Sequence, residues 1–248
     1  MLNFCLTQGL THALQLLLGV MLGRRVLRGS MRVHDTRKIM HFCLFLAPVA
    51  IGAVLQHEKT PLVLALSGLS FLVSLLVLVE PIRSRIPPLA TAFAAIDRPE
   101  DRPYSLAWMI TQLLGDYAAI SLSAWWLAGY GQSELVFLVA AAICFGDGLA
   151  EPIGVRFGRH KYPVPSLARG RTYHRSLEGS AVVFAATLAV VLLARPHLPP
   201  GLFPAAAVAL PVTLTLAEAL APHTWDGPIM YGVGGATLVG LLESVATG

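Results

Sequence analysis

The chain has 248 residues, of which 55% are hydrophobic and only 13% are charged, and its formal net charge is +4. This composition, with a mean hydropathy of +0.67, excludes an ordinary soluble globular protein, in which about 25% of residues are charged. A chain of this length is better divided into membrane spans of about 20 residues each.

Eight apolar segments separated by proline-containing turns predict eight membrane-spanning helices. In chain order they cover residues 2–22, 39–55, 62–79, 106–127, 135–155, 179–194, 202–221 and 229–245. No internal repeat or low-complexity tract is visible in the sequence. The predicted fold class is therefore an all-α integral membrane protein, a polytopic bundle of about eight transmembrane helices that forms a single domain over residues 1–248.

Basic residues are distributed asymmetrically along the chain. With eight spans, all eighteen lysines and arginines except Lys59 and Arg195 fall in connections on one side. Short basic connections face the cytoplasm in membrane proteins, so both termini are expected on the non-cytoplasmic side. This pattern predicts a multi-pass protein of a bacterial inner membrane or an organellar membrane, with its polar connections facing the cytoplasm.

Residues 144–180 hold the densest set of polar groups. On a helix, Asp147, Glu151, Gly154 and Gly158 fall on one face. That face presents two carboxylates and two gaps where another backbone or a ligand can approach closely. Carboxylates beside a cationic loop suit a divalent metal and a polyphosphate, so we expect the catalytic segment here.

Six acidic residues stand inside or at the edges of the predicted spans, where charged groups are costly and usually functional. Asp116 lies near the middle of the fourth span. The other five are expected at the cytoplasmic ends of spans: Glu80, Asp147, Glu151, Glu178 and Glu218. Alternatively, each acid pairs with an arginine and stabilises helix packing. That explanation suits a single acid better than five acids on one side.

Arg37, Lys38 and His41 stand within about one helical turn at the start of the second span. They predict a cationic surface that could contact phosphate, although a histidine at a helix end is more often a capping partner. Three further histidines are expected in loops, exposed to solvent: His160, His174 and His223.

The usual nucleotide and metal motifs do not occur in the sequence. It has no GxxxxGK[ST] phosphate loop, no GxGxxG fingerprint, no protein-kinase signature and no HExxH. Basic connections without interleaved aromatic residues, in a membrane protein, do not predict nucleic acid as a partner. These connections could instead only anchor the topology at anionic headgroups. Any nucleotide chemistry would require a membrane-embedded site of another kind.

Four short blocks resemble the signature of the polyprenol kinase family, which contains dolichol kinase, phytol and farnesol kinases and CTP-dependent diacylglycerol kinase. The central two are Gly146-Asp147-Gly148-x-Ala150 with Gly154 and Phe157-Gly158, and Arg175-Ser176-Leu177-Glu178-Gly179-Ser180. The outer two are Arg37-Lys38-x-x-His41 and Glu218-Ala219-Leu220-x-Pro222. Two departures are Arg175-Ser176, where many members have Lys-Thr, and Asp226-Gly227, where members often have Asp-Asn.

The resemblance implies an enzyme that transfers the γ-phosphoryl of CTP, or of another nucleoside triphosphate, to a prenol-type alcohol such as phytol, farnesol or dolichol. Asp147, with Glu151 or Glu178, would hold Mg²⁺ or another divalent metal. The catalytic acids would be Asp147, Glu178 and Glu218, with Glu218 or Asp147 as the general base. Phosphates would be bound by Arg37, Lys38, His41, Arg156, Arg159, Lys161, Arg171, Arg175, Ser176, Gly179 and Ser180. Membrane lipids are the remaining expected partners, and the oligomeric state is left open.

Two alternatives stay open at this point. A cytidylyltransferase would use the same metal and basic connection to transfer CMP to a lipid phosphate, and it would release pyrophosphate where a kinase releases CDP. An ion- or proton-coupled transporter would use Asp116 with Asp147 and Glu151 as a relay. The transporter predicts acids through the whole membrane and inverted repeats, whereas five of the six acids are expected on one side.

Overall fold

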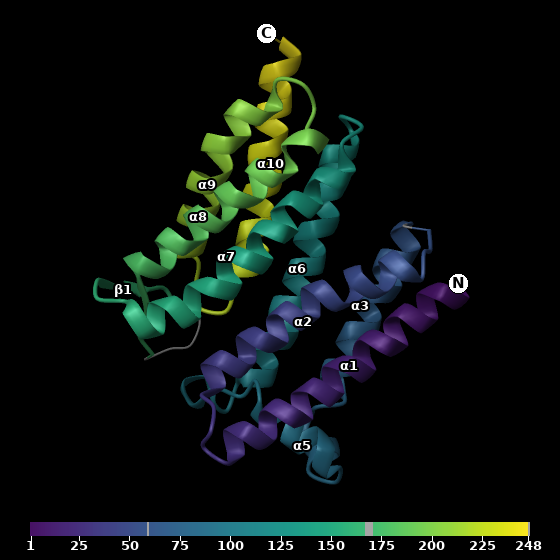
Figure 1. Ribbon diagram of the computed structural model, residues 1–248, viewed down its shortest axis with the longest axis vertical. Helices are drawn as coiled ribbons and strands as arrows, with labels where there is room; N and C mark the ends of the chain where they lie inside the picture. Colours follow the sequence, from purple (N-terminus) through teal and green to yellow (C-terminus); the bar gives the residue numbers. More distant parts are fainter. Residues whose placement is uncertain (59, 167–170, 248) are drawn as a thin grey trace. The chain divides into compact units, whose positions relative to one another are not determined.

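The structure, a computed structural model, describes residues 1–58, 60–166 and 171–247. Within these ranges the regular structure is helical apart from one short hairpin (Figure 1). The chain forms two compact units, Met1–Leu114 and Gly115–Gly248. The boundary falls inside helix α6 (Ser105–Ala128). The single domain expected over residues 1–248 is therefore made of two units, each with its own packing.

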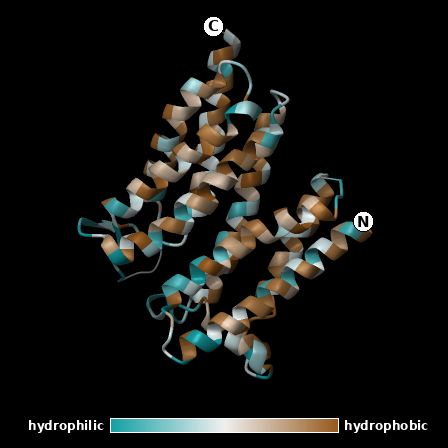
Figure 2. Cartoon of the chain, in the orientation of Figure 1, coloured by the Kyte–Doolittle hydropathy of each residue, from teal (hydrophilic) through white to brown (hydrophobic). Residues whose placement is uncertain are grey.

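Six helices within the described ranges are long and apolar enough to cross a membrane. They are α1 (Leu2–Leu27), α2 (Val33–Val54), α7 (Val136–Phe157), α8 (Leu177–Ala194), α9 (Leu202–Leu220) and α10 (Asp226–Thr247). The other two expected spans are also helices, but α3 (Pro61–Leu76) has only 16 residues, and α6 is not one of the six. Figure 2 shows hydrophobic residues along most of the helical length. An all-α membrane protein is thus confirmed, whereas the count of eight spans and the side of the termini stay predictions.

In the N-terminal unit, α1 packs against α2, α3 and α5 (Pro87–Ala94). The unit also contains the short helix α4 (Glu80–Arg83) and a 3₁₀ turn, η1 (Pro99–Asp101). Polar side chains join α1 to α3 within apolar segments. The side-chain amide of Gln8 donates to Ser67 at 3.1 Å and accepts from Ser70 at 3.0 Å. Such bonds hold membrane helices together, because hydrocarbon offers polar groups no other partner.

One of the proline-containing turns expected between spans, at Pro87-Pro88, begins a short helix, α5. Proline has no N–H to lose at the first position of a helix, and here the pair begins a helix that packs on α1. A Cβ at Gly19 would lie 3.1 Å from the Cβ of Ala92, and one at Gly23 would overlap the carbonyl oxygen of Thr91. Two glycines four residues apart therefore let the α5 backbone approach α1 closely.

This packing predicts that Gly23→Ala destabilises the N-terminal unit. The added methyl group would force α5 away from α1, at a cost of about 1–3 kcal/mol in the free energy of unfolding. Gly9→Ala on the same helix is the matched control, because a Cβ there meets nothing within 4 Å. Thermal unfolding in detergent should show a lower midpoint for Gly23→Ala alone. Equal midpoints for the two variants would contradict the close contact.

The C-terminal unit is a closed bundle, in which α7 packs on α8, α8 on α9, α9 on α10, and α10 on α7. The part of α6 that belongs to this unit contacts α10, where the Ser123 hydroxyl donates to the carbonyl oxygen of Tyr231 at 3.1 Å. The bundle interior contains aliphatic and methionine side chains that are at most 1% exposed: Val139, Val183, Leu210, Leu214, Met230 and Leu238. The 3₁₀ turns η2 (Ser133–Leu135) and η3 (Arg195–His197) lie next to α7 and α8 in the sequence.

The basic connection between α7 and α8 contains an antiparallel hairpin, which the sequence analysis treated as a loop. Strand β1 (Lys161–Val164) pairs with β2 (Tyr173–Ser176), so that Lys161 faces Ser176 and Val164 faces Tyr173. The Tyr173 ring stacks on the ring of His223 with centroids 3.6 Å apart. The backbone N–H of His223 donates to the carbonyl oxygen of Pro165 at 2.9 Å. His223 therefore fixes the hairpin to the α9–α10 connection, and its expected role as a solvated loop residue was wrong.

Candidate functional site

The end of α7 packs closely against the start of α8. A Cβ at Gly154 would lie 2.9 Å from the Oγ of Ser176, and one at Gly158 would lie 2.7 Å from the same oxygen. A Cβ at Gly179 would lie 3.2 Å from the carbonyl oxygen of Ala150. The gaps predicted at Gly154 and Gly158 therefore admit another segment of the protein, Ser176 and its neighbours. These contacts bring the two central motif blocks together.

Ser176 begins α8 as its N-cap. The Ser176 Oγ accepts a hydrogen bond from the backbone N–H of Gly179 at 3.1 Å. A helix start leaves N–H groups without helical partners, and a serine hydroxyl satisfies one of them locally. Both residues were expected to bind phosphate, which stays a prediction, and the hydrogen bond between them caps the start of α8.

Arg175 extends from β2 to α9 and to the start of α10. Its Nε lies 3.0 Å from Oε1 of Glu218, and its Nη2 lies 3.2 Å from Oδ2 of Asp226. Its Nη1 donates to the carbonyl oxygens of Glu218 and Ala221. The side chains of Arg175 and Glu218 are only 13% and 6% exposed. One arginine thus joins the hairpin to both of the last two helices.

The surroundings of Arg175 favour the arginine–acid pairing that the sequence left as an alternative. Burial opposes the charge, but the carboxylates of Asp226 and Glu218 raise the pKa of Arg175 above its usual value. The guanidinium donors point at protein acceptors, and not at an open phosphate site. Buried arginine–carboxylate pairs need this number of bonds, because removing charges from water is costly.

The network continues from Glu218 to the hairpin through two hydroxyl groups. Ser180 donates to Oε2 of Glu218 at 3.3 Å, and the hydroxyl of Tyr162 lies 2.7 Å from Ser180 Oγ. Burial raises the pKa of Tyr162, so its phenol stays protonated at neutral pH. Tyr162 was not predicted, because only the hairpin register brings β1 beside the start of α8.

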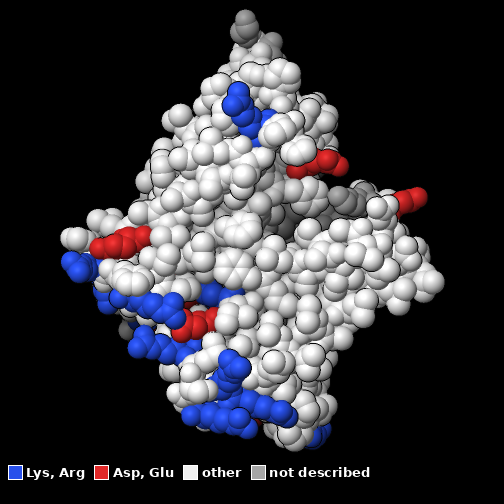
Figure 3. All heavy atoms as spheres, in the orientation of Figure 1, with Lys and Arg blue, Asp and Glu red and all other residues white. Residues whose placement is uncertain are grey.

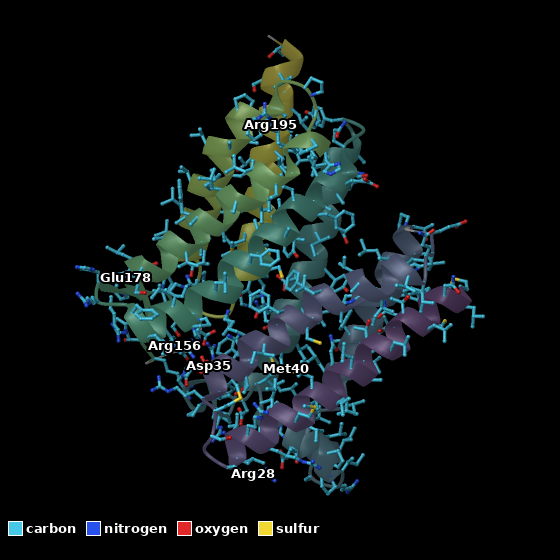
Figure 4. The ribbon with its side chains drawn as sticks, viewed as in Figure 1. Arg28, Asp35, Met40, Arg156, Glu178 and Arg195 are labelled. Atoms are coloured by element: carbon cyan, nitrogen blue, oxygen red, sulfur yellow. The ribbon has the colours of Figure 1, made fainter. Side chains whose placement is uncertain are left out.

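An open pocket of about 500 Å³ lies beside this network, where α7 ends and α8 begins. It is lined by Arg156, Phe157, Gly158, Arg159, His160 and Glu178. The Nδ1 of His160 lies 2.8 Å from Oε1 of Glu178, and the His160 side chain is 72% exposed, as expected, but is also paired. Figure 4 shows Arg156 and Glu178 at the hairpin end of the unit and Arg195 at the other end. Lys and Arg side chains gather over this end in Figure 3.

The other cations expected to bind phosphate lie on two different units. Lys161 is exposed at the start of β1, and Arg171 is partly exposed before β2. Arg37, Lys38 and His41 belong to α2 of the N-terminal unit. Lys38 is only 4% exposed, so its ammonium group does not contribute to an open cationic surface.

The expected metal ligands are only partly brought together. Asp147 and Glu151 lie one turn apart on α7, but the Glu178 carboxylate contacts His160. Across residues 1–58, 60–166 and 171–247, no three His, Cys, Asp or Glu side chains are grouped so that they could hold a metal ion. Mg²⁺ in phosphoryl-transfer sites is usually held by one or two carboxylates plus substrate phosphates. Asp147 and Glu151 fit this smaller requirement, and Glu178 does not join them.

Two further acids have neighbours that the sequence did not indicate. Glu80, one of the five acids expected together, is exposed, belongs to the N-terminal unit and pairs with Arg83. Asp116 lies near the middle of α6, as expected, and its carboxylate packs against the first turn of α10, where a Cβ on Gly227 would overlap it. Its neighbouring charges are Asp226 and Asp147. The sequence could not predict these neighbours of Asp116. They depend on which turn of α6 packs against the first turn of α10.

No protein-family model, no curated protein and no solved structure matches the chain. The motif resemblance to polyprenol kinases therefore stays a prediction from the sequence.

Proposed function

We propose that this chain is a membrane-embedded lipid-alcohol kinase that transfers the γ-phosphoryl of CTP, or of another nucleoside triphosphate, to a prenol-type alcohol. One observation supports this most. The Gly-Asp segment of α7 and the Glu-Gly-Ser segment of α8 pack against each other beside an open pocket that contains two arginines. Phosphoryl transfer needs charge neutralisation and positioning more than covalent help from the protein, and a cationic pocket beside carboxylates supplies both.

Each part of the site has a separate role in this proposal. Arg156 and Arg159 bind the nucleotide phosphates, because guanidinium groups match phosphate oxygens in geometry and charge. Asp147 and Glu151 would hold Mg²⁺, which would supply neutralisation of phosphate charge. The network around Arg175 keeps the hairpin, α9 and α10 in place. The lipid tail lies among the helices, with its hydroxyl at the membrane boundary that faces the cytoplasm.

The proposal is tested with purified protein in detergent, Mg²⁺ and CTP or ATP labelled on the γ-phosphate. The acceptors are phytol, farnesol, long polyprenols and diacylglycerol. Label should appear in an extractable lipid monophosphate, with release of the nucleoside diphosphate. The acceptor that gives the fastest labelling identifies the substrate class.

Parallel reactions with a lipid phosphate as the acceptor separate the two alternatives. Release of pyrophosphate with a lipid phosphate acceptor, and no labelled lipid, would indicate a cytidylyltransferase. Absence of both the labelled lipid and pyrophosphate would favour the transporter. The positions of the acids favour an enzyme over a relay, because Asp147, Glu218 and Asp226 all interact with Arg175 at one end of the C-terminal unit.

Arg159→Ala is expected to weaken nucleotide binding by about 10- to 100-fold, because a charge-assisted bond to phosphate contributes about 1.5–3 kcal/mol. Arg195→Ala is the matched control. It removes an arginine at the opposite end of α8, where the guanidinium lies 5.0 Å from the Phe203 ring centre. Binding of a fluorescent CTP analogue measures both variants. Equal affinities in the two would remove Arg159 from the phosphate site.

A further inference from the structure

Asp116 contains a buried acceptor that the protein leaves unsatisfied. Its Oδ1 is inaccessible to solvent and forms no hydrogen bond within the described structure. Buried carboxylate oxygens almost always have partners, because an unmet acceptor loses its hydration without compensation. An orphaned oxygen of this kind indicates a bond that forms only when something else is bound.

The residues around Asp116 indicate which kind of group can donate a hydrogen bond to Oδ1. Its carboxylate lies against the backbone of Gly227 in the first turn of α10, where any side chain would overlap it. The charged groups that act on it electrostatically are the carboxylates of Asp226 and Asp147. Negative neighbours repel phosphate and favour a group that carries a proton. A hydroxyl group is the donor available in a lipid alcohol.

Glu218, another candidate for the general base, already forms hydrogen bonds with residues of the protein. Glu218 bonds Arg175 through Oε1 and Ser180 through Oε2, so both of its oxygens already have donors. Asp147 is assigned to the metal in the proposed function. Among these three acids, Asp116 is therefore the one with a buried oxygen that accepts no hydrogen bond within the described structure.

We propose that Asp116 is the general base of the kinase and binds the substrate hydroxyl through Oδ1, an inference that rests on the proposed function. Oδ1 takes the hydroxyl proton while the alcohol oxygen forms a bond to the γ-phosphorus. The bond between the γ-phosphorus and its bridging oxygen breaks, and its electron pair leaves with the nucleoside diphosphate. Asp116 then releases the proton to water.

The first test compares Asp116→Asn with Glu134→Gln, which changes an exposed acid beside the opposite end of α7. Asp116→Asn should lower kcat by about 10²–10⁴-fold, the usual contribution of a general base. The nucleotide KM should stay unchanged and the unfolding midpoint should not fall, because no hydrogen bond of Oδ1 is lost. Glu134→Gln should keep the parent kcat.

The second test uses a lipid alcohol with fluorine atoms on the carbon next to the carbinol carbon. Its hydroxyl is more acidic and depends less on a base, so the kcat loss in Asp116→Asn should shrink by about tenfold or more relative to the ordinary alcohol. A purely structural role would slow both alcohols equally.

Three results would overturn the role of Asp116 in an active parent enzyme: full kcat in Asp116→Asn, equal losses with the two alcohols, or failure of the variant to fold. Failure to fold would show that the carboxylate is structural. Absence of any labelled lipid from the parent protein counts instead against the proposed function. The parent assay therefore separates failure of the inference from failure of the function on which it rests.

Discussion

Asp147→Asn is expected to abolish lipid phosphorylation while the protein remains folded and inserted in the membrane. The substitution keeps the size of the side chain but removes a charge that holds the cation on the phosphates. Losing an electrostatic contact to the transferring group typically costs on the order of 10³-fold in kcat. Transfer of label from the γ-phosphate of CTP to the lipid measures the effect, and the unfolding midpoint reports the fold.

Glu134→Gln serves as the control, because it removes an acidic charge next to the other end of α7 in an exposed position. It should retain the parent activity. Raising the Mg²⁺ concentration should restore part of the activity of Asp147→Asn if the residue acts through the metal. Full activity in Asp147→Asn at ordinary Mg²⁺ would remove Asp147 from the site.

Arg175→Met is expected to destabilise the C-terminal unit by about 3–5 kcal/mol, the usual cost of removing one partner from a buried ion pair. Methionine keeps much of the side-chain volume, but the carboxylate of Glu218, which is 6% exposed, loses its cation. Asp226 loses the same partner. Denaturation in detergent micelles measures the free energy of unfolding, and the thermal midpoint should fall with it.

The double variant Arg175→Met with Glu218→Gln is the matched test of this cause. Neutralising Glu218 removes the unpaired buried charge, so the double variant should recover about half or more of the lost stability. An Arg175→Met protein that is as stable as the parent but binds nucleotide weakly would contradict a structural role for Arg175. It would return Arg175 to the phosphate-binding role that the sequence predicted.

Sequence patterns predicted the helices well, because long apolar segments bounded by breakers have few other stable structures in a membrane. All eight expected spans correspond to helices, and six meet the length and hydropathy of a membrane span. The failures were local. Pro87-Pro88 begins α5, since a proline pair can start a helix as well as interrupt one. The strands β1 and β2 have too few residues for a recognisable alternation.

The helical face of Asp147, Glu151, Gly154 and Gly158 was also predictable, because residue spacing alone places side chains around a helix. What approaches the two glycines was not predictable. The structure places Ser176 there, since the hairpin returns the chain to the end of α7. The partner of Glu178 was missed for the same reason, because His160 lies on the other side of the hairpin in the sequence.

The sequence by itself determined the membrane class, the helical segments and the acidic and basic character of residues 144–180, because these depend on composition and on spacing within one helix. Tertiary structure alone decided which charges meet. It directed Arg175 to Glu218 and Asp226, and it buried Oδ1 of Asp116 without a partner at the start of α10. The physical reason is that pairing between helices depends on their depth and rotation against one another, and these follow from the packing of the whole bundle.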